Sequence, residues 1–306
     1  MKIHTDDIEF AAELVPDSLN WRYDYSASAG ESLLNHLFET RKPCWSEGNL
    51  FPYWKELYLV KHARSSQYDR LIELSHRNAE LSDGIVCIAG SGDGFHGFKN
   101  RRWVTLPGNV HLSAYMSPRK NVESFHIGFT ILSAVSVIQT LDRVSGLEGR
   151  AGIKWVNDIL IDGAKVCGVL AQTQSQGSRV TGAVIGIGLN VENSPITDPT
   201  PFVPTSACLR DFVSNPDRCK QNIIFENLVK ILASNYQKLI SGKFKELLEV
   251  YRQRSIVVGR NVTIYSDDSE DNAEIIRKGK VKSIGNNLEL FFEEDSGPIF
   301  KGRLVI

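Results

Sequence analysis

The sequence has few of the features that mark several common classes of protein. Its five cysteines are scattered over 306 residues without a C-x-x-C pair, so neither a disulfide framework nor a zinc site is indicated. No apolar run approaches the roughly 18–20 residues that a membrane span needs. The opening MKIHTDDIEF lacks the basic and apolar regions of a secretory signal. We therefore expect a soluble, cytoplasmic protein with no membrane partner.

An excess of positive charge is also missing. The formal net charge is −1 with 23% charged residues, so the composition gives no reason to expect nucleic acid as a partner. The hydrophobic content of 42% is enough for one large core and a small satellite domain. The functional signal must therefore come from local patterns.

The most informative stretch is residues 154–190. Asp162-Gly163 stands between apolar runs, which is the strongest short-range signal for a tight hairpin. Strict alternation along the second strand would place Lys165 on the same face as Cys167 and Val169. Residues 183–190, AVIGIGLN, indicate a further strand whose glycines let something approach the backbone.

Polar residues stand at the ends of these strands or beside their turns: Lys154, Asn157, Asp158, Lys165 and Asn190. A lysine just after a turn is usually only solvated. Here Asn157 and Asp158 precede the same hairpin, and Gly168 follows three residues later, where a ligand could lie against bare backbone. A fixed ammonium group beside an apolar cleft suits a carboxylate or phosphate oxygen. We predict that Lys165 is the central residue of a ligand site.

Residues 90–103, GSGDGFHGFKNRRW, form a second candidate segment. Its glycines and interleaved cations predict a loop that can fold over an anion. The spacing is neither that of a P-loop nor that of a dinucleotide-binding fingerprint. The alternative is a surface loop whose charges are only solvated.

The remaining pattern alternates strands and helices. Apolar runs predict strands at 57–60, 84–89 and 110–116, a helix through 129–141, and a long amphipathic stripe over 228–248 that is interrupted at Gly242. Ser65 and Ser66 precede another amphipathic run, where serine is a natural helix N-cap. We divide the chain into an N-terminal extension (1–55) packed on a main domain (56–250), followed by a small β-barrel (251–306) of four short strands.

These patterns resemble those of biotin protein ligases. KWVNDILIDGAKVCGVL is similar to the family signature K-W-P-N-D, a hairpin, and K-[LV]-x-G-[IV]-L, although Val156 replaces the usual proline. GIGLNV and PGNVHLS resemble two further family strands. In the loop, Gly97, Lys99, Arg101 and Trp103 match G-R-G-R-x-G-R-x-W. The departures from that motif, which imply weaker retention of an adenylate, are Phe95, His96, Phe98 and Asn100.

The resemblance implies an α+β fold. Its main domain would be a class II synthetase-like mixed or antiparallel sheet with flanking helices, and its C-terminal domain an SH3-like barrel. The implied enzyme is an ATP- and Mg²⁺-dependent ligase that activates biotin as biotinyl-5'-AMP. It then transfers biotin to a lysine of a biotin carboxyl carrier domain of a carboxylase. The chain would be the form without an N-terminal DNA-binding domain, since residues 1–55 show no basic recognition helix. Whether it forms a homodimer stays open.

The resemblance also implies roles for individual residues. Catalysis falls to Lys165 and Arg101; biotin binding to Ser65, Ser66, Gly97, Lys165 and Gly168; ATP and adenylate binding to Lys99, Arg101, Trp103, Lys154, Asn157, Asp158 and Asn190; and Mg²⁺, held through phosphates, to Asp158. Two alternatives remain. One is a lipoate or octanoate ligase, which shares the catalytic fold, and the other is a degenerate biotin-binding regulator without catalysis.

Overall fold

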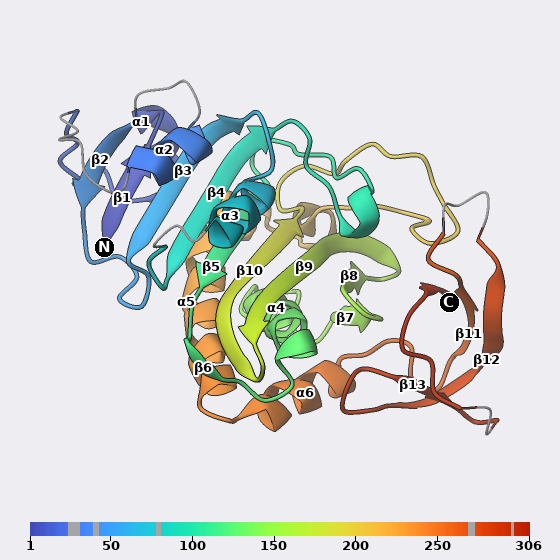
Figure 1. Ribbon diagram of the computed structural model, residues 1–306. Helices are drawn as coiled ribbons and strands as arrows, with labels where there is room; N and C mark the ends of the chain where they lie inside the picture. The colour runs from blue at the N-terminus through green and yellow to red at the C-terminus, as the bar shows by residue number, and fades with distance from the viewer. Residues whose placement is uncertain (24–30, 39–42, 78–80, 269–272, 295–296) are drawn as a thin grey trace.

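Figure 1 shows the chain as a computed structural model, which describes residues 1–23, 31–38, 43–77, 81–268, 273–294 and 297–306. A large mixed sheet is its main feature. Across the sheet the strands are β2 (Cys44–Glu47), β1 (Lys2–Thr5), β3 (Glu56–Ala63), β4 (Ile85–Gly92), β5 (Val110–Met116), β10 (Arg179–Leu189), β9 (Ala164–Gln176), β8 (Asp158–Ile161) and β7 (Ala151–Lys154), with β6 (Lys120–Asn121) paired to β10. The strands predicted at 57–60, 84–89 and 110–116 are confirmed as parts of β3, β4 and β5.

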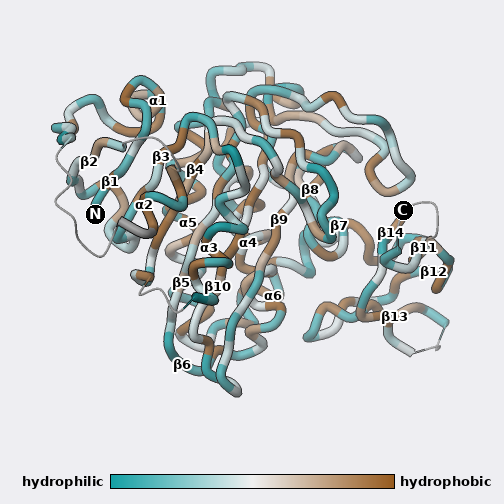
Figure 2. Tube along the Cα trace, turned by 45° about the horizontal axis from the view of Figure 1, so that its top comes forward, coloured by the Kyte–Doolittle hydropathy of each residue, from teal (hydrophilic) through white to brown (hydrophobic). Residues whose placement is uncertain are grey.

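Helices cover both faces of this sheet. They are α1 (Ile8–Leu14), α2 (Glu31–Phe38), α3 (Gln67–His76), α4 (Phe125–Leu141), α5 (Gln221–Ile240) and α6 (Phe244–Gln253). The apolar α4 is buried on most sides because it lies between the sheet and α5 and α6, whereas α3 packs on the opposite face (Figure 1). Figure 2 shows the apolar stretches along the strands and helices of this body. The predicted α+β class is confirmed, and the amphipathic stripe is interrupted at Gly242, whose φ is +77°.

The N-terminal segment contributes strands to the sheet. β1 pairs in parallel with β3 and antiparallel with β2, and so extends the sheet beyond β3. The side chain of Trp54 donates a hydrogen bond to the Val229 carbonyl of α5 at 3.0 Å. The domain boundary near residue 55 stays a prediction. β1 and β3, which lie on either side of it, are neighbours in one sheet.

The hairpin at Asp162-Gly163 is confirmed, but the predicted face of Lys165 is wrong. Both turn residues have positive φ (49° and 86°), as a two-residue hairpin loop with the right twist requires. Ile159 pairs with Cys167 and Leu160 with Lys165, which leaves Val166 as a bulge. The extra residue reverses the alternation, so Lys165 shares a face with Gly168 while Cys167 and Val169 point into the core.

The C-terminal segment forms a four-stranded antiparallel sheet in the order β13-β12-β11-β14. Its strands are β11 (Asn261–Tyr265), β12 (Ile275–Ile284), β13 (Leu290–Phe292) and β14 (Arg303–Val305). The predicted closed barrel is wrong for the described residues, because β13 and β14 are short and do not pair with each other. This sheet is tied to the main body by the indole N–H of Trp155, which donates to the Leu288 carbonyl at 2.6 Å.

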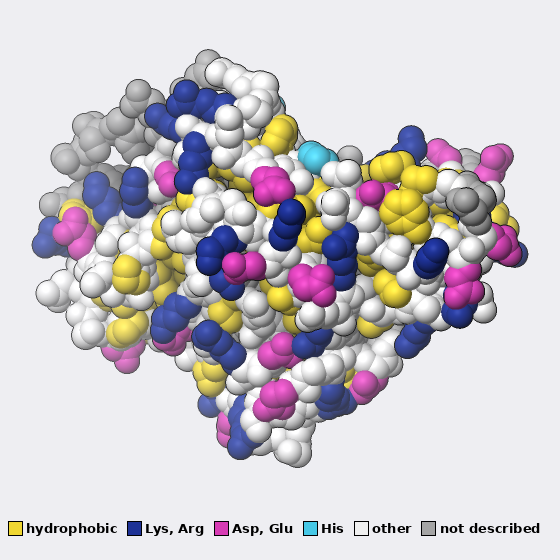
Figure 3. Space-filling view, turned by 90° about the horizontal axis from the view of Figure 1, so that it is seen from below, with side chains coloured by type: hydrophobic (Ala, Val, Ile, Leu, Met, Phe, Trp, Pro, Cys, Tyr) yellow, Lys and Arg dark blue, Asp and Glu magenta, His cyan; other side chains and the backbone are white. Residues whose placement is uncertain are grey.

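Figure 3 shows acidic and basic side chains interspersed over the face seen from below. No helix within the described ranges has both the length and the apolar character needed to cross a membrane.

Candidate ligand cavity

A cavity of about 640 Å³ opens on the α3 side of the main sheet. Four segments surround it: the sheet itself, the glycine-rich loop, the segment 195–206 and the C-terminal residues 300–304. Most of the residues predicted for the site line it, namely Ser66, Gly97, Arg101, Trp103, Lys154, Asn157, Asp158, Lys165, Gly168 and Asn190. The other two, Ser65 and Lys99, do not. The structure therefore brings together side chains that the sequence placed on several separate segments.

The floor of the cavity is a row of residues that crosses four strands. His111 of β5 lies opposite Gly188 of β10, which lies opposite Gly168 of β9, which lies opposite Asp158 of β8. Facing residues of paired strands share one side of the sheet. The row thus has a histidine at one end, a carboxylate at the other and two glycines between them.

The two glycines of this row make room for Trp103. A β-carbon on Gly188 would lie 2.4 Å from Cε2 of the indole, and one on Gly168 would lie 3.4 Å from Cζ3. Real Cβ atoms do not tolerate the first distance. The glycines admit the protein's own aromatic side chain, so the space predicted for ligand on bare backbone at Gly168 is shared with Trp103.

Lys165 lies at the acidic end of the row. Its Nζ is 2.6 Å from Oδ1 of Asp158 and 5.7 Å from the centre of the Trp103 ring. The two charged side chains are 20% and 21% exposed, so the pair is largely shielded yet open to the cavity. The backbone of Lys165 is fixed as well, because its N–H donates to Thr205 and its carbonyl accepts from Ala207. The ammonium group is therefore held in place beside the cavity.

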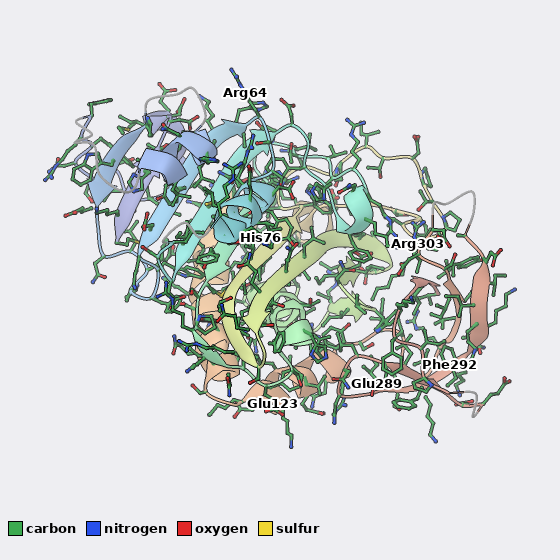
Figure 4. The ribbon with its side chains drawn as sticks, in the orientation of Figure 1. Arg64, His76, Glu123, Glu289, Phe292 and Arg303 are labelled. Carbon is green, nitrogen blue, oxygen red and sulfur yellow. The ribbon has the colours of Figure 1, made fainter. Side chains whose placement is uncertain are left out.

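Lys154 is more deeply buried than its sequence position suggested. It is 6% exposed, donates to the carbonyl of Phe202, and its pKa is lowered by burial although Asp158 opposes that change. Through this bond it anchors the segment 195–206. Arg303, labelled in Figure 4, stacks on the Phe202 ring with Cζ 3.4 Å from its centre.

The two asparagines make backbone contacts. The Asn157 amide donates to the Val169 carbonyl at 2.7 Å, and the Asn190 amide to the Ala207 carbonyl at 3.1 Å. The Oδ1 of Asn190 is buried without a hydrogen-bond partner in the described residues. Both asparagines therefore use their amide donors to hold neighbouring backbone, Asn157 at β9 and Asn190 at Ala207.

The glycine-rich loop folds back on itself at the edge of the cavity. The N–H of Gly97 donates to the Arg101 carbonyl at 2.6 Å, and the N–H of Trp103 donates to the Phe95 carbonyl at 3.0 Å. A short 3-10 turn, η1 (Phe98–Asn100), forms its tip. Lys99 at this tip does not line the cavity, but it donates to the backbone carbonyl of Asp267 in the C-terminal segment, which does.

A histidine–carboxylate pair fastens this loop to α3. Nε2 of His96 is 2.8 Å from Oδ2 of Asp69, and Nδ1 lies 3.0 Å from the Gly97 carbonyl. Burial alone would lower the pKa of His96, but the hydrogen bonds to Gly97 and Asp69 outweigh it and raise the pKa above the usual value. The pair is therefore strongest when His96 is protonated.

We predict that Asp69→Asn lowers Tm more at about pH 5.5 than at about pH 8.5. The stabilisation is fully present below the unfolded-state pKa of histidine, roughly 6.5, and is lost as pH rises through the raised folded-state pKa. Thermal melts of both proteins across this range measure the effect. Asp217→Asn, which removes an exposed carboxylate 3.2 Å from Lys220, is the control and should show no such difference between the two pH values. Equal losses for Asp69→Asn at both values would contradict the prediction.

The two serines have different surroundings. Ser66 is the N-cap residue of α3, but its side chain makes no capping bond, and it is 4% exposed while lining the cavity. Ser65 accepts a hydrogen bond from Nε of Arg70 at 2.9 Å, outside the cavity lining. Of the two, Ser66 is the one placed to contact a ligand.

Several lining residues were not predicted from the sequence. Tyr68 packs over Gly186, His111 forms one end of the floor, and Phe202 and Arg303 close the side nearest the C-terminal sheet. The alternating pattern at 110–116 predicted a strand through His111. Which face of that strand lines the cavity depends on how the strand is placed in the sheet, which the local pattern does not reveal. Nothing local marked Phe202 or Arg303. Among the described residues, no group of three or more His, Cys, Asp or Glu side chains could hold a metal ion by itself.

The chain is similar in sequence to known proteins. The chain is 26% identical over 207 residues to the Bifunctional ligase/repressor BirA of Bacillus subtilis, which covers 67% of this chain and 62% of that protein's length. It is 28% identical over 230 residues to the Biotin--[acetyl-CoA-carboxylase] ligase of Mycobacterium tuberculosis, over 73% and 80% of the two chains. The chain thus spans less than two thirds of the Bacillus relative.

A solved structure has the same fold. The biotin protein ligase of Aquifex aeolicus, in complex with biotin and ATP, superposes with a TM-score of 0.64 at 20% identity, covering 82% of this chain and 98% of that one. Residues 62–190, which include the glycine-rich loop, the hairpin and the floor of the cavity, match the Biotin/lipoate A/B protein ligase family. The resemblance seen in the sequence is thereby confirmed over these residues.

Proposed function

We propose that this protein is an ATP-dependent biotin protein ligase of the cytoplasm. The observation that carries the proposal is the cavity, in which a fixed ammonium group, Lys165, lies beside a cationic glycine-rich loop and a shielded aromatic floor. The named relatives are ligases or ligase/repressors of this kind, and the superposed Aquifex protein was solved with biotin and ATP.

The reaction needs charge neutralisation rather than a covalent nucleophile on the enzyme. A carboxylate oxygen of biotin attacks the α-phosphorus of ATP, and pyrophosphate leaves, giving biotinyl-5'-AMP. The amine of an acceptor lysine then attacks the acyl carbon of this mixed anhydride, and AMP leaves. Positioning and preorganised positive charge lower both barriers. We assign Lys165 to the carboxylate and α-phosphate oxygens, and Arg101 to the phosphate from the side of the loop.

The remaining contacts follow from where each side chain lies. We assign Ser66 and Gly97 to the biotin end, and the indole of Trp103 to the surface against which the acid packs. We assign Asn190 and Lys154 to the adenylate because both line the cavity, and Lys154 lies close enough to Asp158 to raise the positive potential there. Ser65 and Lys99, which have other partners, would support the site only indirectly.

Magnesium fits this site only together with ATP. Mg²⁺ usually takes one or two carboxylates plus phosphate oxygens and water, and it neutralises phosphate charge. Asp158 lines the cavity and could supply one such oxygen, since Lys165 occupies only one side of its carboxylate. The acceptor we propose is the biotin carboxyl carrier domain of a carboxylase.

The proposal is tested by asking which acid drives pyrophosphate release. Purified protein with ATP and Mg²⁺ should release pyrophosphate with biotin, and much less with lipoate or octanoate. Release with lipoate or octanoate in preference to biotin would favour the rival ligase. A second assay, single-turnover transfer of labelled biotin to a carrier domain, separates the ligase from a regulator that holds biotin without transferring it.

A further inference from the structure

Large apolar side chains gather around the opening of the cavity. Among the described residues, five such side chains are more than half exposed, and three of these five line the cavity. They are Phe98 in the glycine-rich loop (51% exposed), Ile196 in the segment after β10 (99%) and Phe300 in the C-terminal segment (64%). Single exposed apolar residues are common on proteins, whereas apolar residues that gather at one place mark an interaction site.

The three segments that carry these side chains meet around the opening. Lys99 at the loop tip donates to the Asp267 carbonyl of the C-terminal segment at 3.0 Å. Phe202, from the segment 195–206, stacks on the guanidinium group of Arg303. In Figure 1 the connection between β10 and α5 accordingly passes close to the C-terminal end of the chain. The three exposed apolar side chains therefore belong to one surface.

The reaction determines what must cover this surface. The inference rests on the proposed function, in which a lysine of the acceptor attacks an acyl carbon held beside Lys165. Lys165 lines the cavity and is only 20% exposed. A fully extended lysine side chain reaches roughly 6 Å from its Cα, so the backbone of the acceptor must come to the opening itself. The acceptor surface around that lysine then presses on the side chains that surround the opening.

The charges at the opening match an acidic partner. Among the described lining residues, the exposed cations are Arg101, Arg102 and Lys301, against one exposed carboxylate, that of Asp198. Opposite charges across an interface steer the partner toward it and suppress wrong partners. An acceptor with carboxylates near its lysine is therefore attracted to this opening.

We propose that the apolar opening, formed by Phe98, Ile196 and Phe300, is the docking surface for the acceptor, a folded domain with apolar and acidic side chains around its lysine. Apolar side chains at the centre of an interface supply much of its affinity. The resemblance seen in the sequence places an arginine at the position of Phe98, so this part of the surface is particular to this chain. The surface acts in the transfer step and not in the formation of the adenylate.

Two assays separate these steps. Biotin-dependent pyrophosphate release without an acceptor measures adenylate formation. Transfer is measured with two nucleophiles, a biotin carboxyl carrier domain and hydroxylamine. The nitrogen of hydroxylamine attacks the acyl carbon, a C–N bond forms, the bond from this carbon to the phosphate oxygen breaks, AMP leaves and a proton goes to solvent. Hydroxylamine is too small to need a docking surface.

Ile196→Ser and Phe300→Ser should each raise KM for the carrier domain by about tenfold, the value of one apolar side chain buried at an interface. Lys301→Glu should raise this KM as well, and less so at high salt. All three variants should keep pyrophosphate release and transfer to hydroxylamine within about twofold of the wild type, because the exposed side chains do not hold the adenylate. Phe98 stays unchanged in this test, because its loop is assigned to the phosphates.

A matched control lies on the opposite face of the sheet. Ile223 is 39% exposed on α5 and does not line the cavity, so Ile223→Ser should leave KM for the carrier domain unchanged. An equal rise in KM for this variant would contradict the inference, because exposed apolar residues anywhere would then have the same effect.

The outcomes are distinguishable. An unchanged KM for both apolar variants overturns the inference and leaves the proposed function standing. An equal loss of transfer to hydroxylamine also overturns it, because the residues would then act on the adenylate. An unchanged KM for Lys301→Glu overturns the acidic character of the partner. If the wild type releases no pyrophosphate with biotin, or releases it but labels no carrier domain, the proposed function or its acceptor fails, and the inference fails with it.

Discussion

Lys165→Ala is expected to reduce biotin-dependent pyrophosphate release by about a hundredfold to a thousandfold while the protein still folds. Two observations set this size. The ammonium group is held 2.6 Å from Asp158 beside the cavity, so its charge is preorganised. Its removal also leaves the partly buried Asp158 without this partner, which places an uncompensated negative charge where anionic substrates must bind. Steady-state pyrophosphate release and a thermal melt measure the two effects.

A matched control contacts the turn of the same hairpin. Arg150 is 2.5 Å from Asp162, in the turn that precedes Lys165, and does not line the cavity. Arg150→Ala breaks an ion pair of the hairpin without touching the site, so we expect pyrophosphate release close to the wild-type rate. Lys154 is unsuitable for this purpose because it lines the same cavity and anchors Phe202. A rate for Lys165→Ala equal to that of Arg150→Ala would show that the ammonium group is not catalytic.

Gly188→Ala is expected to damage both stability and activity. The new methyl group would lie 2.4 Å from Cε2 of Trp103, so the indole must move off the floor of the cavity. Overpacking of this kind costs about 1–3 kcal/mol of unfolding free energy. Because the indole lies on the cavity floor beside Lys165, misplacing it should also lower kcat/KM by about a hundredfold. Urea unfolding and pyrophosphate release provide the measurements.

Gly168→Ala is the comparison for this change. Gly168 faces Gly188 across the strands, but its methyl group would lie 3.4 Å from Trp103 and 3.5 Å from Nζ of Lys165, which is close to ordinary contact. We therefore expect a clearly smaller loss for Gly168→Ala than for Gly188→Ala. Equal losses would mean that the effect comes from the glycine backbone and not from the position of the indole.

The sequence predicted best what local chemistry determines. The turn at Asp162-Gly163 depends on two residues that accept positive φ, and the break at Gly242 depends on one. Both can be recognised without knowing the rest of the chain. The association of the glycine-rich loop with Lys165 came from family spacing, and the two segments line one cavity.

Long-range pairing determined what the sequence did not predict. β1 lies beside β3, more than fifty residues away, and its short strand has no pattern that names its partner. Phe202 and Arg303 meet only because the C-terminal sheet folds back toward the main body. The prediction of a closed barrel was wrong for a similar reason. Four strand-like segments do not reveal whether the first and last strands of the sheet will pair with each other.

The bulge at Val166 has a consequence for how this site could be lost or gained. Side chains of a strand alternate between the two faces of its sheet. One additional residue moves every side chain on one side of the insertion to the opposite face. If Val166 were kept but the strand paired regularly, without the bulge, every chemical group of the site would remain, yet the ammonium of Lys165 would turn toward the apolar interior or Gly168 would change sides. In this strand, the way the residues between lysine and glycine are paired therefore carries as much functional information as their identities.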